Sequence, residues 1–329
     1  MHILIADKFE AAGIAGLERL GATVTVEPDL QPDTLPAALN RTGAKVLVVR
    51  STKVPAAVLD AAPTLEAVIR AGAGYDNIDC DHAAERGIAV CNTPGMNAVA
   101  VAELTMGHLI NLDRRLPEQD AEIKAGHWNK KEYAKSRGLK GMTMLVIGTG
   151  AIGTEVIKRA QAFGIEIWAQ SRSLGDDTAR ALGIRPLPYT RDALYEALPR
   201  MDAVTIHLAA TDDTRGLCDE RFFAAMKPGA YFINTSRGEV VVEEALIEAV
   251  KTKGIRAALD VYHNQPKEPA APWTSKVAQT SGVYGSHHCG ASTDQAQFAV
   301  AEEVVRIVSE HMSGGEWLHQ VNAASTARR

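Results

Sequence analysis

The sequence predicts an α/β protein built from two doubly wound, parallel sheets. Short apolar runs alternate with stretches of helical spacing along most of the chain, which is typical of βα units. A glycine-rich turn at 148–153 lies between one such run and one such helix. The length of 329 residues exceeds a single ordinary core, so we expect two domains.

The first half of the chain repeats the βα pattern. Strands are expected at residues 3–6, 23–26, 45–49 and 65–70, with helices at 9–20, 33–39 and 54–61 between them. A long helix from Asn97 to about Leu112 is apolar nearly all round, which indicates burial between domains or subunits.

The alternation resumes at Thr143 and continues to about Val283, and a final helix is expected at 293–311. If that helix packs on the first sheet, the second domain is an insertion into the first. The periodicity of the sequence does not decide whether the final helix packs there.

The turn at 148–153 predicts a dinucleotide site. Gly148 allows a tight turn after the apolar run 142–147, Gly150 lets a pyrophosphate approach the backbone, and Gly153 allows close packing of helix and strand. Ala151 and Ile152 begin the helix, so their N–H groups should point at the phosphates.

Composition and charge exclude several classes of protein. The net charge of −5 gives no basic surface for nucleic acid, and no stretch approaches the roughly 20 apolar residues of a membrane span. The four cysteines lack paired spacing, and the N-terminus lacks the apolar length of a signal peptide. We therefore expect a cytoplasmic enzyme that binds neither nucleic acid nor membrane.

Motifs along nearly the whole chain resemble those of the D-isomer-specific 2-hydroxyacid dehydrogenases, most closely the short phosphoglycerate dehydrogenases that lack a regulatory domain. The matching segments are 49–53, 70–79, 92–94 with Asn97, 102–105, 126–128, 148–153, 234–238, 258–261 and 288–293. The resemblance implies a flavodoxin-like substrate domain (1–96 plus 290–329) and a Rossmann nucleotide-binding domain (97–289). It also implies a homodimer built on the nucleotide-binding domains.

The residues expected to carry catalysis are Arg237 and His288. Arg237 follows the apolar run 230–234, at the carboxyl end of an expected strand, and its guanidinium can bind two carboxylate oxygens at once. His288 resembles the family's acid/base histidine, and its titration range suits proton exchange near neutrality. A surface salt bridge for Arg237 and a metal cluster at 287–289 are the alternatives; the cluster lacks a fourth ligand nearby, and no metal is expected.

The sequence departs from the family where a Glu normally pairs with this histidine. Gln265 occupies that position, as in the related formate dehydrogenases, which move a hydride without shuttling a proton. A carboxylate raises the pKa of a neighbouring imidazole, whereas a neutral amide offers only a hydrogen bond. Glu268 could supply the missing carboxylate if the loop is offset.

A second departure concerns the cofactor. NAD-specific members carry an acid about 20 residues beyond the glycine turn, which binds the ribose hydroxyls. Here Ser171 and Arg172 occupy that place, and Glu166 lies too early in the strand. A hydroxyl and a guanidinium would bind a 2′-phosphate, so NADP is favoured over NAD. Dual specificity is also open, and the alternative is a solvated Arg172 in an enzyme that prefers NAD. The resemblance adds Thr235 and Asp260 to the cofactor site, with Asp260 beside the nicotinamide; a capping role is the alternative for Asp260.

Substrate binding is predicted for Arg50, Ala73, Gly74 and Asn97, which resemble the family's carboxylate-binding surface. Turn amides without large side chains form an anion-binding nest. The lysines at 130–131 could bind a phosphate, or they form an ordinary solvated surface.

Together these observations predict an NAD(P)-dependent oxidoreductase acting on a small D-2-hydroxy acid or 2-oxo acid, of phosphoglycerate dehydrogenase or hydroxypyruvate/glyoxylate reductase type. In this interpretation Arg237 orients the substrate, His288 transfers the proton and Gln265 positions His288. A hydride-only enzyme of formate dehydrogenase type and a non-catalytic dinucleotide-sensing protein are the alternatives.

Overall fold

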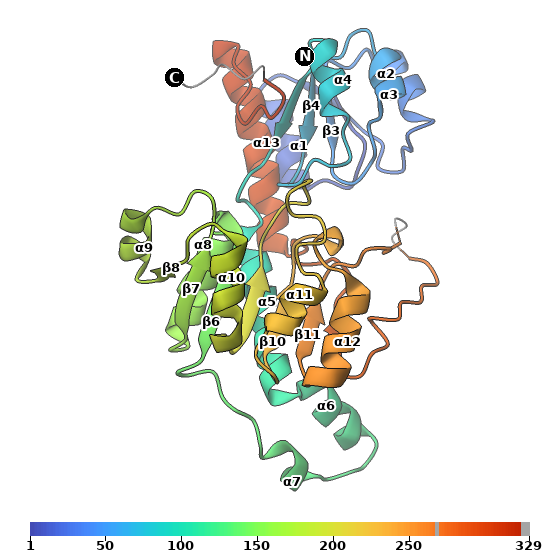
Figure 1. Cartoon of the computed structure of the whole chain (residues 1–329). Coiled ribbons are helices and arrows are strands. Elements are labelled where there is room, and N and C mark those ends of the chain that lie inside the picture. Colours follow the sequence, from blue (N-terminus) through green and yellow to red (C-terminus); the bar gives the residue numbers. More distant parts are fainter. Residues whose placement is uncertain (267–269, 324–329) are drawn as a thin grey trace. The chain divides into compact units, whose positions relative to one another are not determined.

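The computed structural model describes residues 1–266 and 270–323, which form two compact units, each built around a parallel sheet (Figure 1). Unit 1 contains residues 1–97 and the described residues from Ser292 onward, and unit 2 contains residues 98–291. Both sheets are wholly parallel, so the predicted α/β class is confirmed.

Unit 1 has a five-stranded sheet in the order β2-β1-β3-β4-β5, which is the flavodoxin-like order. Its elements are β1 (His2–Ile5), α1 (Ala11–Arg19), β2 (Thr23–Val26), α2 (Leu35–Thr42), β3 (Val46–Val49), α3 (Ala56–Asp60), β4 (Ala67–Arg70), α4 (Cys80–Glu85), β5 (Ala89–Asn92) and α13 (Asp294–Gly314). The strands at the centre are buried on both faces, which explains their uninterrupted Val, Leu and Ile runs.

The C-terminal helix α13 returns to the first sheet. Its residues Val300, Val304 and Ile307 share an apolar cluster with Ile3 and Ile5 of β1. Glycines on α1 permit this approach, because a Cβ at position 13 would lie 2.8 Å from the Cβ of the alanine at 301. The second unit is therefore an insertion into the first.

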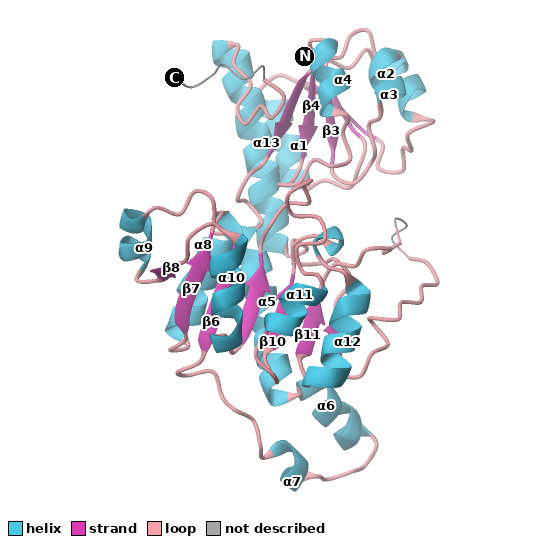
Figure 2. Cartoon of the chain, in the orientation of Figure 1, coloured by secondary structure: helices cyan, strands magenta, loops and turns pink. Residues whose placement is uncertain are grey.

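Unit 2 has a seven-stranded sheet in the order β12-β11-β10-β9-β6-β7-β8. Figure 2 labels β8, β7, β6, β10 and β11 in sequence across this sheet. Its elements are α5 (Ala98–Arg114), α6 (Leu116–Lys124), α7 (Lys130–Tyr133), β6 (Thr143–Ile147), α8 (Ala151–Ala162), β7 (Glu166–Gln170), α9 (Asp176–Leu182), β8 (Arg185–Pro186), α10 (Arg191–Ala197), η1 (Leu198–Arg200), β9 (Ala203–Ile206), α11 (Glu220–Ala225), β10 (Tyr231–Asn234), η2 (Gly238–Val240), α12 (Glu243–Lys253), β11 (Arg256–Leu259) and β12 (Val283–Gly285). Helices α5, α8 and α9 pack on one face, and α10, α11 and α12 pack on the other.

The expected long helix after Asn97 corresponds to α5, and ten of its side chains are buried. Between α5 and β6 the chain forms the two short helices α6 and α7, which periodicity did not predict; this segment, residues 115–141, is called the arm below. No helix in the described part of the chain combines the length and apolarity needed to cross a bilayer.

Candidate active site

The glycine turn lies at the carboxyl end of β6, between β7 and β9, where the strand order of the sheet reverses. Gly148 has φ +96°, and a Cβ there would lie 2.3 Å from the carbonyl oxygen of His207. A Cβ at Gly153 would lie 2.0 Å from the carbonyl oxygen of Gly148. A Cβ at Gly150 would meet nothing within 4 Å, so this position faces open space. Two glycines are thus required by packing, and the third leaves room for an anion at the start of α8.

The second nucleotide strand ends beside this turn, because the Gly148 N–H donates to the carbonyl of Gln170 over 2.8 Å. Ser171 follows directly, and Arg172 is exposed. Glu166 is the first residue of β7, at the opposite end of the strand, and pairs with Arg185 at 3.6 Å. The two residues that follow the strand at this end are therefore a serine and an arginine, and neither is an acid.

Arg237 is placed by a tight turn after β10. The Asn234 amide donates to the Arg237 carbonyl over 2.9 Å and accepts from the Ser236 N–H and hydroxyl. The next residue, Gly238, packs against the backbone of Tyr262, because a Cβ there would lie 2.2 Å from the Tyr262 carbonyl carbon. This contact brings the Arg237 turn against the loop that carries Gln265.

Gln265 contacts His288 directly. The backbone N–H of Tyr262 donates to Gln265 Oε1 over 3.1 Å, so the NH₂ end of the amide faces the imidazole. Gln265 Nε2 lies 2.5 Å from His288 Nδ1. Since an amide N–H can only donate, Nδ1 accepts, and the ring proton of neutral His288 lies on Nε2. The alternative carboxylate, Glu268, lies outside the described residues.

Asp260 holds the turn on which His288 lies. Its buried carboxylate accepts hydrogen bonds from the Ser286 hydroxyl (2.6 Å), the Cys289 N–H (3.0 Å) and the Gly290 N–H (2.9 Å). Its carbonyl accepts from the His288 N–H at 2.8 Å. Asp260 is therefore a structural anchor of this turn as well as a candidate for the cofactor site.

Thr235, which the resemblance adds to the cofactor site, lies in the interior of unit 2. The hydroxyl of Thr235 is buried and pairs with the hydroxyl of Thr105 at 3.0 Å, so its side chain faces α5. Across residues 1–266 and 270–323, no group of three or more His, Cys, Asp or Glu side chains is arranged to hold a metal ion.

In unit 1, the predicted substrate residues lie in the segments that follow β3, β4 and β5. Asp7 accepts from the Arg50 N–H at 2.6 Å and fixes the start of that loop. The Ala73 carbonyl accepts from the Asn92 amide at 2.7 Å. Asn97 has a buried Oδ1 with no hydrogen-bond partner in the described part of the chain. A buried acceptor of this kind can take a donor from a small molecule.

The sequence reasoning missed three residues of this region. His207 follows β9 and packs against Gly148; its Nδ1 is buried without a partner among the described residues, and burial lowers its pKa to about 3. Its position after an apolar run could have signalled it. His108 and Ser286 form a part-buried hydrogen bond across 178 positions of sequence, which no local pattern indicates.

The strand order and the glycine turn at its switch point define a nucleotide-binding α/β protein, with the Gln265–His288 contact on a neighbouring turn of the same unit. Residues 106–290, more than half of the chain, match the family described as D-isomer specific 2-hydroxyacid dehydrogenase, NAD binding domain. The chain belongs to this family.

Similar proteins share this assignment. The D-3-phosphoglycerate dehydrogenases of Methanocaldococcus jannaschii and Rattus norvegicus are 38% and 35% identical over 94% and 98% of this chain. The chain spans 57% and 58% of their lengths. The solved TT0316 protein from Thermus thermophilus is 30% identical (TM-score 0.83), covering 98% of this chain and all of that one. A glyoxylate reductase from Paecilomyes thermophila is 26% identical (TM-score 0.84), with 98% of each chain covered.

Proposed function

We propose that the protein is an NAD(P)-dependent D-2-hydroxyacid dehydrogenase that interconverts a small 2-hydroxy acid and its 2-oxo form. The observation that carries the proposal is the meeting of the Arg237 turn with the loop that bears Gln265, which contacts His288 at 2.5 Å. These groups follow β10, β11 and β12, on the same edge of the sheet as the glycine turn. The similar proteins named D-3-phosphoglycerate dehydrogenase and glyoxylate reductase support this substrate class.

Each residue has a defined role in this proposal. A bound nicotinamide cofactor supplies or accepts the hydride. The Arg237 guanidinium binds the substrate carboxylate and polarises the oxygen that changes oxidation state. His288 exchanges the proton with that oxygen, and Gln265 holds the His288 ring in place. In unit 1, Arg50, the turn at 72–74 and Asn97 bind the substrate.

The test is a panel of 2-oxo acids, including hydroxypyruvate, its 3-phosphate, glyoxylate and pyruvate, assayed with NADH and NADPH by absorbance. Arg237→Ala should lower kcat/KM by at least about two orders of magnitude, and Arg237→Lys should recover only part of the loss, because lysine cannot bind two oxygens at once. Comparable turnover by the alanine variant would remove Arg237 from the mechanism.

A second candidate function follows from the orientation of the Gln265 amide. An amide donating to Nδ1 of His288 favours the neutral ring, whereas a protonated ring needs a hydrogen on that atom. Neutral His288 can still donate from Nε2, which suits a reaction that moves a hydride and no proton. Formate should therefore join the panel with NAD⁺ and NADP⁺, and reduction of cofactor by formate alone would favour this function.

For the cofactor, we propose a preference for NADP. Ser171 and Arg172 follow Gln170, whose carbonyl accepts from the glycine turn. The only acid on β7 is Glu166, which lies at the far end of the strand and pairs with Arg185. A 2′-phosphate would then meet a hydroxyl and a cation rather than a carboxylate.

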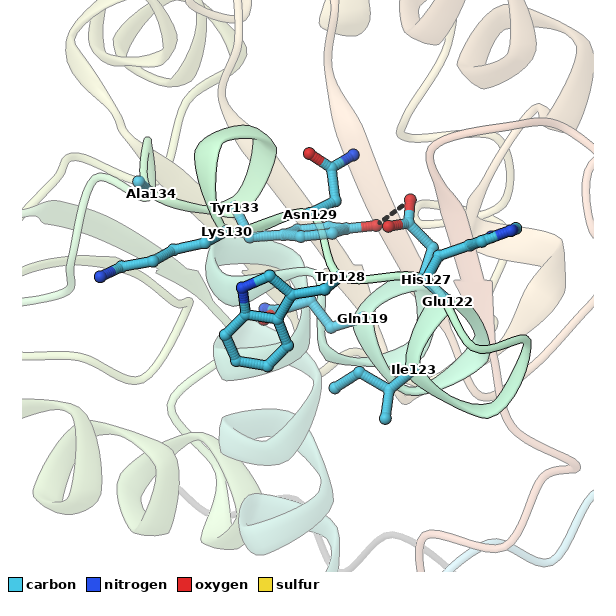
Figure 3. A pocket seen from close by; sticks show the side chains of 9 residues that line it. All are labelled: Gln119, Glu122, Ile123, His127, Trp128, Asn129, Lys130, Tyr133 and Ala134. Atoms are coloured by element: carbon cyan, nitrogen blue, oxygen red, sulfur yellow. Dashed lines mark hydrogen bonds between the residues drawn. The ribbon is translucent and has the colours of Figure 1, made fainter.

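We also propose a homodimer formed through unit 2. The arm exposes large apolar side chains, with Trp128 83% and Ile123 60% exposed. These side chains line a pocket of about 270 Å³ together with Tyr133, whose hydroxyl donates to Glu122 (Figure 3). An exposed tryptophan beside an apolar hollow is typical of a protein interface, and a second copy of the arm is the occupant we propose.

A further inference from the structure

A partly buried series of hydrogen bonds, called the hydrogen-bonded chain below, leads from helix α5 to the turn that carries His288. His108 is 4% exposed, and its Nε2 lies 3.0 Å from the hydroxyl oxygen of Ser286. That hydroxyl lies 2.6 Å from Oδ1 of Asp260, which is itself 1% exposed. The three groups come from α5, from the end of β12 and from the end of β11.

The direction of each hydrogen bond in this chain follows from its chemistry. A carboxylate accepts only, so the Ser286 hydroxyl donates its proton to Asp260. The hydroxyl oxygen can then only accept from His108, whose proton must lie on Nε2. Burial lowers the pKa of His108, although the Asp260 charge acts in the opposite direction. The chain therefore runs from a neutral imidazole N–H, through a hydroxyl, to a buried carboxylate.

Asp260, the last group in this series of hydrogen bonds, holds a turn in an unfavourable conformation. His288 has φ +51°, a left-handed conformation that residues with a Cβ adopt rarely. The Asp260 carboxylate bonds the next two N–H groups, those of Cys289 and Gly290. A carboxylate that rotated freely would lose both bonds together and release the strained turn.

We propose that His108 is a positioning residue, which fixes the Asp260 carboxylate through Ser286 and thereby holds the turn that carries His288. The kinetic part of this inference rests on the proposed function, because it takes His288 as the acid/base group. The hydrogen bonds from His108 through Ser286 to Asp260 belong to the folded protein and can be tested without measuring activity.

The kinetic test uses four variants. His108→Leu removes the donor, His108→Gln keeps an N–H near the same place, Ser286→Ala interrupts the chain, and Met106→Leu is a volume-conserving control on the same helix. His108→Leu and Ser286→Ala should each lower kcat roughly tenfold with little change in KM, because they misplace His288 and not the binding groups.

Three further results are expected from the same set. His108→Gln should restore most of the lost kcat, Met106→Leu should match wild type, and the double variant His108→Leu/Ser286→Ala should lose no more than either single change. Unchanged kcat in both single variants, additive losses, or an equal loss in Met106→Leu would overturn the inference.

The test that does not depend on activity is ¹⁵N NMR of the histidine rings. The wild-type spectrum should show His108 as the neutral Nε2–H tautomer, and Ser286→Ala should shift its Nε2 resonance. A proton on Nδ1 would overturn the inference, because Ser286 would then have to donate to His108 and not to Asp260. A wild-type protein without oxo-acid turnover would contradict the proposed function, while these spectra would still decide on the chain.

Discussion

Replacing Gln265 by Glu tests how His288 is tuned. Gln265 Nε2 lies 2.5 Å from His288 Nδ1, so a carboxylate there would replace a donor by an acceptor and a charge. If the introduced carboxylate and the His288 imidazolium have their charge centres about 4 Å apart, they attract each other by about 4 kcal/mol at an effective dielectric constant of 20. The pair is solvent-exposed, so screening reduces this to about 1 kcal/mol, which corresponds to somewhat less than one pKa unit.

The assay is the pH dependence of kcat/KM in both directions. Oxo-acid reduction uses imidazolium, so its rate should fall as pH rises through the titration of His288. The Gln265→Glu variant should move this falling limb upward by somewhat less than one unit, because the carboxylate favours imidazolium. Oxidation of the hydroxy acid needs the neutral ring, so its rising limb should move upward as well.

The matched control is Asn264→Asp, which adds the same charge to the neighbouring position of the loop. The Asn264 carbonyl accepts from Trp273, so the backbone there should keep its place. This control should leave both limbs within a few tenths of a unit. An unchanged profile in Gln265→Glu, or an equal shift in the control, would refute the reasoning; in the first case Glu268→Gln would show whether that residue fills the role.

Three other changes have definite expected outcomes. Ser171→Asp with Arg172→Ala should move the preference from NADPH towards NADH, measured as the ratio of the two kcat/KM values. A wild type that prefers NADH would refute the proposed cofactor preference. Trp128→Glu should dissociate the dimer in sedimentation velocity, and a monomeric wild type would contradict the interface. Glu303→Gln should lower the free energy of unfolding by about 1–2 kcal/mol at pH 7, because its hydrogen bond to Arg306 lowers the carboxyl pKa. This difference in unfolding free energy between wild type and variant should vanish as pH falls below the ordinary carboxyl range, because Glu303 is then protonated. A difference that does not change with pH would contradict the role of the Glu303 charge.

Features with strong local signals could be predicted from the sequence. The glycine turn was recognisable because Gly148, Gly150 and Gly153 stand between an apolar run and a helical pattern, and the structure shows the steric need for two of them. The strands of both sheets gave clear apolar runs because parallel strands are buried on both faces. The contact of Gln265 with His288 was expected from the family resemblance, which aligns Gln265 with the Glu that pairs with this histidine.

Other features depend on contacts between distant residues or on weak local patterns. The arm contains two short helices, and its polar side chains carry little periodicity. The bond between His108 and Ser286 joins a helix to a turn far along the chain, and each residue alone resembles an ordinary core or loop position. The amide orientation of Gln265 depends on one backbone N–H, that of Tyr262, which no side-chain pattern reveals.

The most direct test of the proposed activity is stereochemical. Purified protein is supplied with NADP⁺ or NAD⁺ and either the D or the L enantiomer of glycerate, 3-phosphoglycerate or lactate, and formation of reduced cofactor is followed by absorbance. We predict that the D enantiomer of at least one of these acids is oxidised, that its L enantiomer is not, and that Arg237→Ala abolishes the rate. Oxidation of an L enantiomer, or no oxidation of any of these acids by protein that binds the cofactor in a fluorescence titration, would contradict the proposed activity.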